Sequence, residues 1–248
     1  MTNYKFEICT NSVESSLAAE QGGANRVELC AGIPEGGTTP SYGEIAMARK
    51  YLNIKVHVII RPRGGDFFYT PLEIETMIKD IELCQELKVD GVVFGCLNAD
   101  GSINMPAMRE LMKASQGLSV TFHRAFDVCS DPRKALEQII DLGCHRILTS
   151  GQEKNAELGI PLLKEINTLA NGRIIILAGC GVNEQNIKKI ALETGITEFH
   201  FSAREEKPSP MVYRRERVPM GGAIKIDEFS RPITTVKRVK DTIAQLAE

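Results

Sequence analysis

Residues 5–30, KFEICTNSVESSLAAEQGGANRVELC, contain the unit that decides the fold. Short runs of apolar and β-branched residues at 5–9 and 26–30 predict two strands. The pattern at 12–21 between them predicts a helix, and it ends at Gly22-Gly23. A strand, a helix and a second strand in this order favour two parallel strands joined by a right-handed crossover.

The same alternation of strand and helix recurs to the end of the chain. Eight strands are predicted, at 5–9, 26–30, 55–61, 91–97, 119–125, 146–150, 173–179 and 198–203. Intervening or final helices are predicted at 71–87, 131–142, 183–194 and 233–247. The length of 248 residues matches one eight-unit barrel. We therefore predict an α/β protein with a single (β/α)8 TIM-type barrel domain over 1–248, with a long loop at about 204–232 before the C-terminal helix.

Composition excludes several functional classes. The formal net charge of −2 gives no basic footprint for nucleic acid, and no apolar run approaches the length of a membrane span. The seven cysteines are dispersed without a CxxC pair, which is typical of reduced thiols in the cytoplasm. We expect a cytoplasmic protein that binds neither nucleic acid nor membrane.

Polar residues interrupt strands that should be apolar, because both faces of a parallel barrel strand are normally buried. Strand alternation places Glu7 with Cys9, and Glu28 with Cys30, on the side that faces the barrel axis. The residues between them are apolar and should face the helices. Barrel active sites lie at the carboxyl ends of the strands, so this end of the barrel is the predicted site.

Titratable residues near these strand ends are candidate catalytic groups if the protein is an enzyme. They are Glu7, Glu28, His123 and Asp127. His123 or Glu28 would then act as general base or acid. A buried carboxylate needs a cation or a proton, and we expect Arg61 and Arg63 to neutralise Glu7 and Glu28. The alternative is a structural network in which these charges only neutralise each other.

The stretch IRPRGGDF at 60–67 predicts a clamp for an anion. The proline between Arg61 and Arg63 favours extended backbone, so both guanidiniums should project to the same side. Gly64 and Gly65 would let backbone amides approach a ligand. Two guanidiniums with free amides suit a carboxylate or a phosphate.

Small residues end the sixth, seventh and eighth predicted strands. Barrels often bind phosphate there, through backbone amides and helix N-termini. Tight turns would equally explain the glycines. Further candidate anion-binding residues are Ser150, Gly151, Gly179, Gly181 and Ser202.

Cys9 and Cys30 end two consecutive strands on the same predicted face. Neighbouring strands lie about 4.8 Å apart. Two thiolates on one ion, with bonds of about 2.3 Å, lie no more than about 4.6 Å apart. The pair could therefore hold a soft ion such as Cu(I) in two-coordinate fashion. Alternatively, both cysteines are small hydrophobic residues of the interior.

Several motifs together resemble the CutC family of copper homeostasis proteins. They are FEICTNSVESSLAAEQGGANRVELC, EGGTTPSYG, IRPRGGDF, VTFHRAFD, ILTSGQ and FHFSA, and the resemblance runs from about residue 6 to 230. It implies a TIM-type barrel, a cytoplasmic homodimer and Cu(I) binding by thiols that match Cys9 and Cys30.

Two functions therefore stay open. One is a cytoplasmic copper homeostasis protein that binds Cu(I) through its strand-end thiols. The other is a TIM-barrel enzyme that acts on a small anionic or phosphorylated metabolite at the C-terminal mouth of the barrel. The fold does not choose between them, because barrels host many chemistries.

Overall fold

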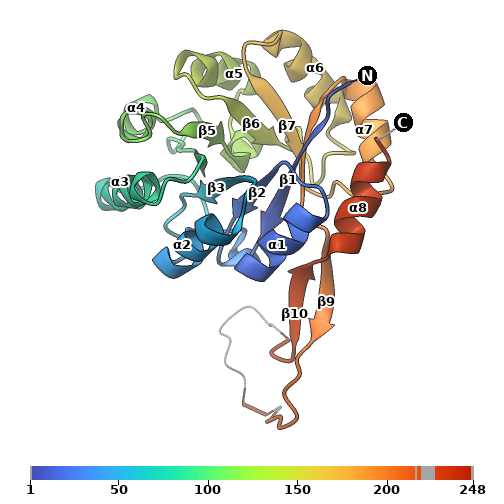
Figure 1. Ribbon diagram of the computed structural model, residues 1–248. Helices are drawn as coiled ribbons and strands as arrows, with labels where there is room; N and C mark the ends of the chain where they lie inside the picture. Colours follow the sequence, from blue (N-terminus) through green and yellow to red (C-terminus); the bar gives the residue numbers. More distant parts are fainter. Residues whose placement is uncertain (1, 216, 219–226, 247–248) are drawn as a thin grey trace.

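The computed structural model describes residues 2–215, 217–218 and 227–246 (Figure 1). Eight parallel strands close into a barrel, in which each strand pairs with the next along the chain and the eighth pairs with the first. The predicted (β/α)8 TIM-type barrel is thereby confirmed. The strands are β1 (Lys5–Thr10), β2 (Arg26–Leu29), β3 (Lys55–Ile59), β4 (Gly91–Phe94), β5 (Ser119–Phe122), β6 (Arg146–Thr149), β7 (Ile175–Gly179) and β8 (Glu198–Phe201).

Helices surround the barrel (Figure 1). Side-chain caps set where several of them begin: the Ser12 hydroxyl accepts from the Ser15 amide, and Thr70 and Glu73 form a capping box. The helices are α1 (Val13–Gln21), α2 (Tyr42–Tyr51), α3 (Pro71–Glu86), α4 (Met105–Ala114), α5 (Pro132–Asp141), α6 (Ile160–Ala170), α7 (Ile187–Thr194) and α8 (Val236–Ala244), with short 3-10 helices η1 (Ile33–Glu35) and η2 (Arg124–Val128).

The core lies between the barrel and its helices. Strand residues that alternate with the polar set, such as Ile8, Val27 and Phe199, are fully buried in one apolar cluster with helix residues such as Met77 and Leu111. Because the outward face of each strand is apolar, the polar residues of the same strands face the barrel axis. This arrangement agrees with the sequence prediction.

An antiparallel ribbon of β9 (Arg204–Pro208) and β10 (Ser230–Thr234) projects away from the barrel (Figure 1). β9 lies within residues 204–232, and β10 overlaps the end of this range. The sequence predicted a loop over the whole range, so that prediction is wrong at both ends of the segment. REEKP is polar and mostly exposed, and SRPIT is mostly half-buried; neither has the apolar alternation by which a strand is recognised. Residues 216 and 219–226 lie outside the described residues.

The last helix begins three residues later than predicted. Residues 233 and 234 belong to β10, and the Thr235 hydroxyl caps α8 by accepting from the Arg238 amide. The predicted end at residue 247 lies outside the described residues. No helix within the described ranges is long and apolar enough to cross a membrane.

Candidate functional site

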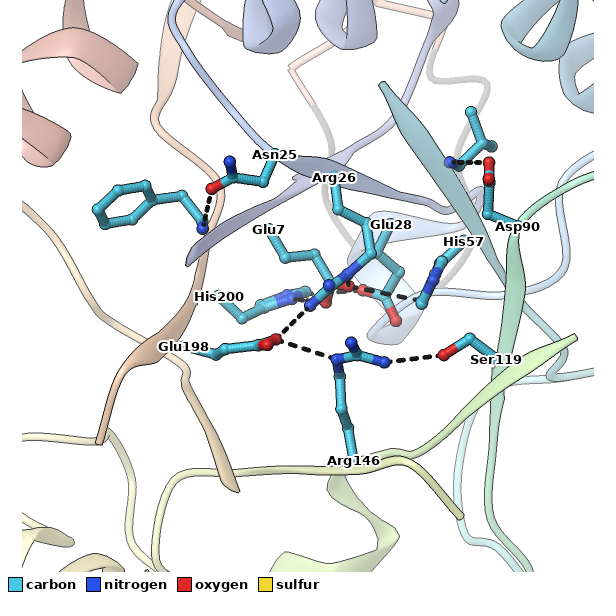
Figure 2. Close-up of polar contacts among 12 residues, drawn as sticks. Glu7, Asn25, Arg26, Glu28, His57, Asp90, Ser119, Arg146, Glu198 and His200 are labelled. Carbon is cyan, nitrogen blue, oxygen red and sulfur yellow. Dashed lines mark hydrogen bonds and ion pairs between the residues drawn. The ribbon is translucent and has the colours of Figure 1, made fainter. Parts of the chain in front are cut away.

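A network of buried charges fills the barrel interior. Figure 2 shows Glu7, Arg26, Glu198 and Arg146 turned toward one another. The Arg26 guanidinium donates to the Glu7 carboxylate and, at 2.9 Å, to Glu198. The Arg146 Nε also donates to Glu198, at 3.0 Å. Glu7 and Glu198 therefore each have a guanidinium partner, as the cost of burying an isolated charge requires.

The expected pairing of Arg61 and Arg63 with Glu7 and Glu28 is wrong. The Arg61 guanidinium donates instead to three backbone carbonyls, those of Glu35, Gly37 and Gly65, at 2.9, 2.8 and 2.7 Å. Arg61 lies beyond the end of β3. The Gly65 carbonyl belongs to the loop that follows β3, and those of Glu35 and Gly37 belong to the loop after β2. Arg61 therefore anchors the loops after β2 and β3.

Arg63 lies farther from the barrel axis than the sequence suggested. Its guanidinium pairs with Glu73 at 2.5 Å and with Asp66 at 3.0 Å, and its side chain is 38% exposed. The two arginines therefore do not form the clamp that the motif predicted.

Sequence reasoning missed Arg26, Arg146 and Glu198 as members of the network. Each is the first residue of its strand and stands two positions before a residue that faces the barrel axis, as Arg26 does before Glu28. Residues two positions apart in a strand point to the same face. The alternation rule that selected Glu28 could therefore have found all three.

The predicted thiol pair is present at the barrel mouth. The Sγ atoms of Cys9 and Cys30 are 3.8 Å apart. The Arg204 Nη2 donates to the Cys9 sulfur at 3.3 Å, and the Cys30 thiol donates to a Glu28 oxygen at 3.5 Å. One ligand atom from each of Cys9, Glu28 and Cys30 lies within 4.8 Å of the others, so the three could hold one metal ion.

The two thiols differ in acidity. The hydrogen bond from Cys30 lowers the pKa of Cys9 well below its usual value; His200 and Arg204 lower it further, and together they outweigh burial. The bond to Cys9 and burial raise the pKa of Cys30. Burial also raises the pKa of Glu28 to about 8. Cys9 is therefore the more acidic thiol of the pair.

His200, on β8, connects the thiols to the charge network. Its Nδ1 lies 2.8 Å from a Glu7 oxygen, and its Nε2 lies 3.5 Å from a Glu28 oxygen. Burial lowers the pKa of His200, but Cys9, Glu28 and Glu7 outweigh it and hold the pKa well above its usual value. The His200 ring therefore lies between the side chains of Glu7 and Glu28. The alternation in FHFS at 199–202 predicts the barrel-facing side for His200, but no motif indicated a role for it.

A cavity of about 490 Å³ opens at the carboxyl ends of the strands, and the thiol pair lines it. The cavity brings together part of the predicted site. The predicted residues that line it are Cys9, Cys30, Glu28, Arg61, His123, Asp127, Gly181 and Ser202. Those outside its lining are Glu7, Arg63, Gly64, Gly65, Ser150, Gly151 and Gly179.

His123 forms part of the cavity wall and is 4% exposed. Its Nδ1 accepts from the Ala125 amide at 3.3 Å, so the proton of the neutral ring is on Nε2, which has no hydrogen-bond partner. Burial first, and then the charge of Arg61, lower the pKa of His123 to about 3. At neutral pH His123 is therefore a neutral hydrogen-bond donor.

Asp127 anchors the loop after β6. Its carboxylate accepts from the Arg124 Nε at 2.7 Å and from the amides of Ser150 and Gln152 at 3.0 and 3.2 Å. The Ser150 amide, which the sequence predicted to bind an anion, therefore already donates its hydrogen bond to the Asp127 carboxylate. The remaining predicted roles of these loop residues stay predictions.

Acid should destabilise the protein through two buried neutral histidines. Burial lowers the pKa of His57 and of His123 to about 3, against about 6.5 in an unfolded chain. Between these values the unfolded chain binds protons that the folded chain does not. The free energy of unfolding should thus fall as pH drops from about 6.5 to about 3, by up to about 1.4 kcal/mol per pH unit for each histidine.

Urea titrations at several pH values test this expectation. His123→Gln should lose the contribution of one histidine, so the stability gap between wild type and variant should shrink as pH falls from about 6.5. A gap that is constant with pH would contradict a buried neutral His123.

Comparisons with known proteins identify relatives along nearly the whole chain. The model of the CutC family matches residues 4–205. A CutC family protein of Bacteroides fragilis is 69% identical over 247 residues, which are 99% of this chain and 98% of the relative. The human copper homeostasis protein cutC homolog is 45% identical over 237 residues, 96% of this chain and 87% of that protein. A crystal structure of CutC from Streptococcus agalactiae superposes with a TM-score of 0.77 at 39% identity, covering 80% of this chain and 98% of that one.

Proposed function

From the premise that this chain belongs to the CutC family of copper homeostasis proteins, we propose that it binds Cu(I) between Cys9 and Cys30. The observation that carries the proposal is the 3.8 Å separation of the two sulfur atoms at the wall of an open cavity. Two bonds of about 2.3 Å to one ion allow sulfurs up to about 4.6 Å apart, so the pair needs little adjustment to bind one ion.

The surroundings of the thiols favour a soft monovalent ion. Thiolate sulfur prefers Cu(I) to hard cations. A Cu(I) ion held by two thiolates carries a net charge of −1, which the Arg204 guanidinium and the His200 imidazolium would offset. Glu28 offers an oxygen as a third, weaker ligand.

Anaerobic titration of the reduced protein tests the proposal. The protein should take up one Cu(I) per chain in competition with a chromophoric Cu(I) chelator, and Mg²⁺ at the same concentration should not displace it. Uptake of several Cu(I) ions with equal affinity would instead indicate nonspecific binding by the scattered thiols. The cytoplasmic location and the homodimer that the family resemblance implies stay predictions.

A second candidate function is an enzyme that acts on a small anionic or phosphorylated metabolite. The size of the cavity favours it, since about 490 Å³ lies in the range of small-molecule pockets and exceeds the needs of a single ion. Glu28, His123 and Asp127 line the cavity and would be its acid–base groups. A thermal-shift screen of metabolites tests it, because a ligand at about 100 times its Kd adds about 2.7 kcal/mol of stability.

A further inference from the structure

Three guanidiniums line the mouth cavity, those of Arg61, Arg124 and Arg204. Among the ion pairs between described residues, only Arg124 has a carboxylate partner, Asp127. Guanidinium groups stay charged at any physiological pH. Two positive charges at the cavity are therefore not matched by a carboxylate of the described chain.

Arg61 is the more deeply buried of the two, at 5% exposure. Its Nη groups donate to three backbone carbonyls, and its guanidinium lies 5.1 Å from the centre of the Phe67 ring. These neighbours are dipoles and an aromatic face, which carry no net negative charge. Its Nε has no hydrogen-bond partner among the residues that the structure describes. A buried charge without a counter-ion is costly, so an anion in the cavity would stabilise it.

Arg204 extends from the start of β9 to the thiol pair. Its Nη2 donates to the carbonyl oxygen and to the sulfur of Cys9, both at 3.3 Å, and its Nε has no partner. Arg61 binds the carbonyl of Gly37 at 2.8 Å, and the Gly37 backbone lies beside Cys30. Both arginines thus line the same cavity as the thiols.

The carboxylates of the cavity wall are already engaged. Asp127 accepts from Arg124 and from loop amides, and a Glu28 oxygen lies 3.5 Å from the His200 ring. Neither carboxylate is within ion-pair distance of Arg61 or Arg204 in the part of the chain that the structure describes. The acidic Cys9 thiol lies against Arg204, whereas Arg61 has only carbonyl and aromatic neighbours, so Arg61 leaves the cavity with a positive surplus.

We infer that the mouth cavity binds a small organic oxyanion, a carboxylate or a phosphate monoester, whose charge is matched by Arg61 and Arg204. The Nε2–H of His123, which has no protein partner, donates to a neutral oxygen of the same molecule, a hydroxyl or a carbonyl. The inference rests on the second candidate function and names the residues that would recognise its anionic ligand. It assigns anion recognition to Arg204, which the sequence motif did not indicate, and removes Arg63 from that role.

Three probes of similar size separate charge from shape: glycerol 3-phosphate, glycerate and glycerol. Titrated into ¹⁵N-labelled protein at constant ionic strength, at least one of the two anions should shift the NMR signals of the cavity residues to saturation. Glycerol should bind at least tenfold more weakly. The two anions distinguish a phosphate site from a carboxylate site.

Variants of the arginines complete the test. Arg204→Gln should weaken binding of the anion at least tenfold, and Arg204→Lys should restore part of it. Arg61→Gln should act in the same direction if it folds, since it also loses three carbonyl contacts. Arg63→Gln is the matched control, because Arg63 belongs to the same loop as Arg61 but lies outside the cavity lining; it should bind like the wild type.

The inference is overturned if neither anion gives a saturable shift, if glycerol binds as tightly as the anions, or if Arg204→Gln leaves their affinity unchanged. The second candidate function fails separately. It fails only if the metabolite screen finds no ligand, charged or neutral, for the cavity.

Discussion

Arg26→Met should lower the free energy of unfolding by about 3–5 kcal/mol, the loss typical of removing one partner from a buried ion pair. Arg26 is 4% exposed and bridges Glu7 and Glu198, which are 1% and 8% exposed. Without it, Arg146 and His200 are the remaining cations in contact with these carboxylates. Urea unfolding followed by circular dichroism measures the loss.

Two further variants make the result specific. Arg63→Met removes an arginine from an exposed pair and should cost no more than about 1 kcal/mol. Glu7→Gln combined with Arg26→Met should recover part of the loss, because it removes the carboxylate that was left without its partner. A loss below about 1 kcal/mol for Arg26→Met alone would show that the barrel interior compensates Glu7 without Arg26.

Cys9→Ser combined with Cys30→Ser should abolish most Cu(I) binding. Loss of a residue that only contacts a metal ligand typically lowers metal affinity by roughly 10–100-fold. A hydroxyl is a hard, weak ligand for Cu(I), so replacing both ligands should lower the affinity by more than this. Competition with a chromophoric Cu(I) chelator measures the affinity of both proteins. The fold should persist, because Cys-to-Ser changes at the mouth leave the core between barrel and helices untouched.

Cys180→Ser is the matched control for this pair. Cys180 is also a partly exposed thiol in the wall of the same cavity, but its sulfur contacts the Lys154 carbonyl rather than Cys9 or Cys30. The Cu(I) affinity of Cys180→Ser should equal that of the wild type. If the double serine variant binds Cu(I) with unchanged stoichiometry and affinity, the thiol-pair site is wrong.

The residues that the sequence predicted well are those fixed by local periodicity. Alternation along single strands placed Glu7, Glu28 and both thiols on the barrel-facing side, and the spacing of neighbouring strands predicted that Cys9 and Cys30 approach each other. The count of strand–helix units predicted the closed barrel. These inferences need no knowledge of how distant segments meet.

The partners of Arg61 were not predictable in this way. Its contacts are carbonyls of the loops after β2 and β3, whose positions depend on φ angles such as the +81° of Gly65 and on how the loops fold over the mouth. Arg26 reaches Glu198 across 172 positions of sequence, a contact that only barrel closure creates. The ribbon of β9 and β10 was missed because neither strand has the regular apolar alternation of a strand packed on a core.

Copper K-edge X-ray absorption of the Cu(I)-loaded protein tests the central claim most directly. We expect two sulfur atoms in the first coordination shell of the wild type and of Cys180→Ser, and their loss when Cys9 and Cys30 are both serine. A first shell of nitrogen or oxygen alone in the wild type, or a sulfur shell that survives in the double serine variant, would contradict copper binding by this thiol pair.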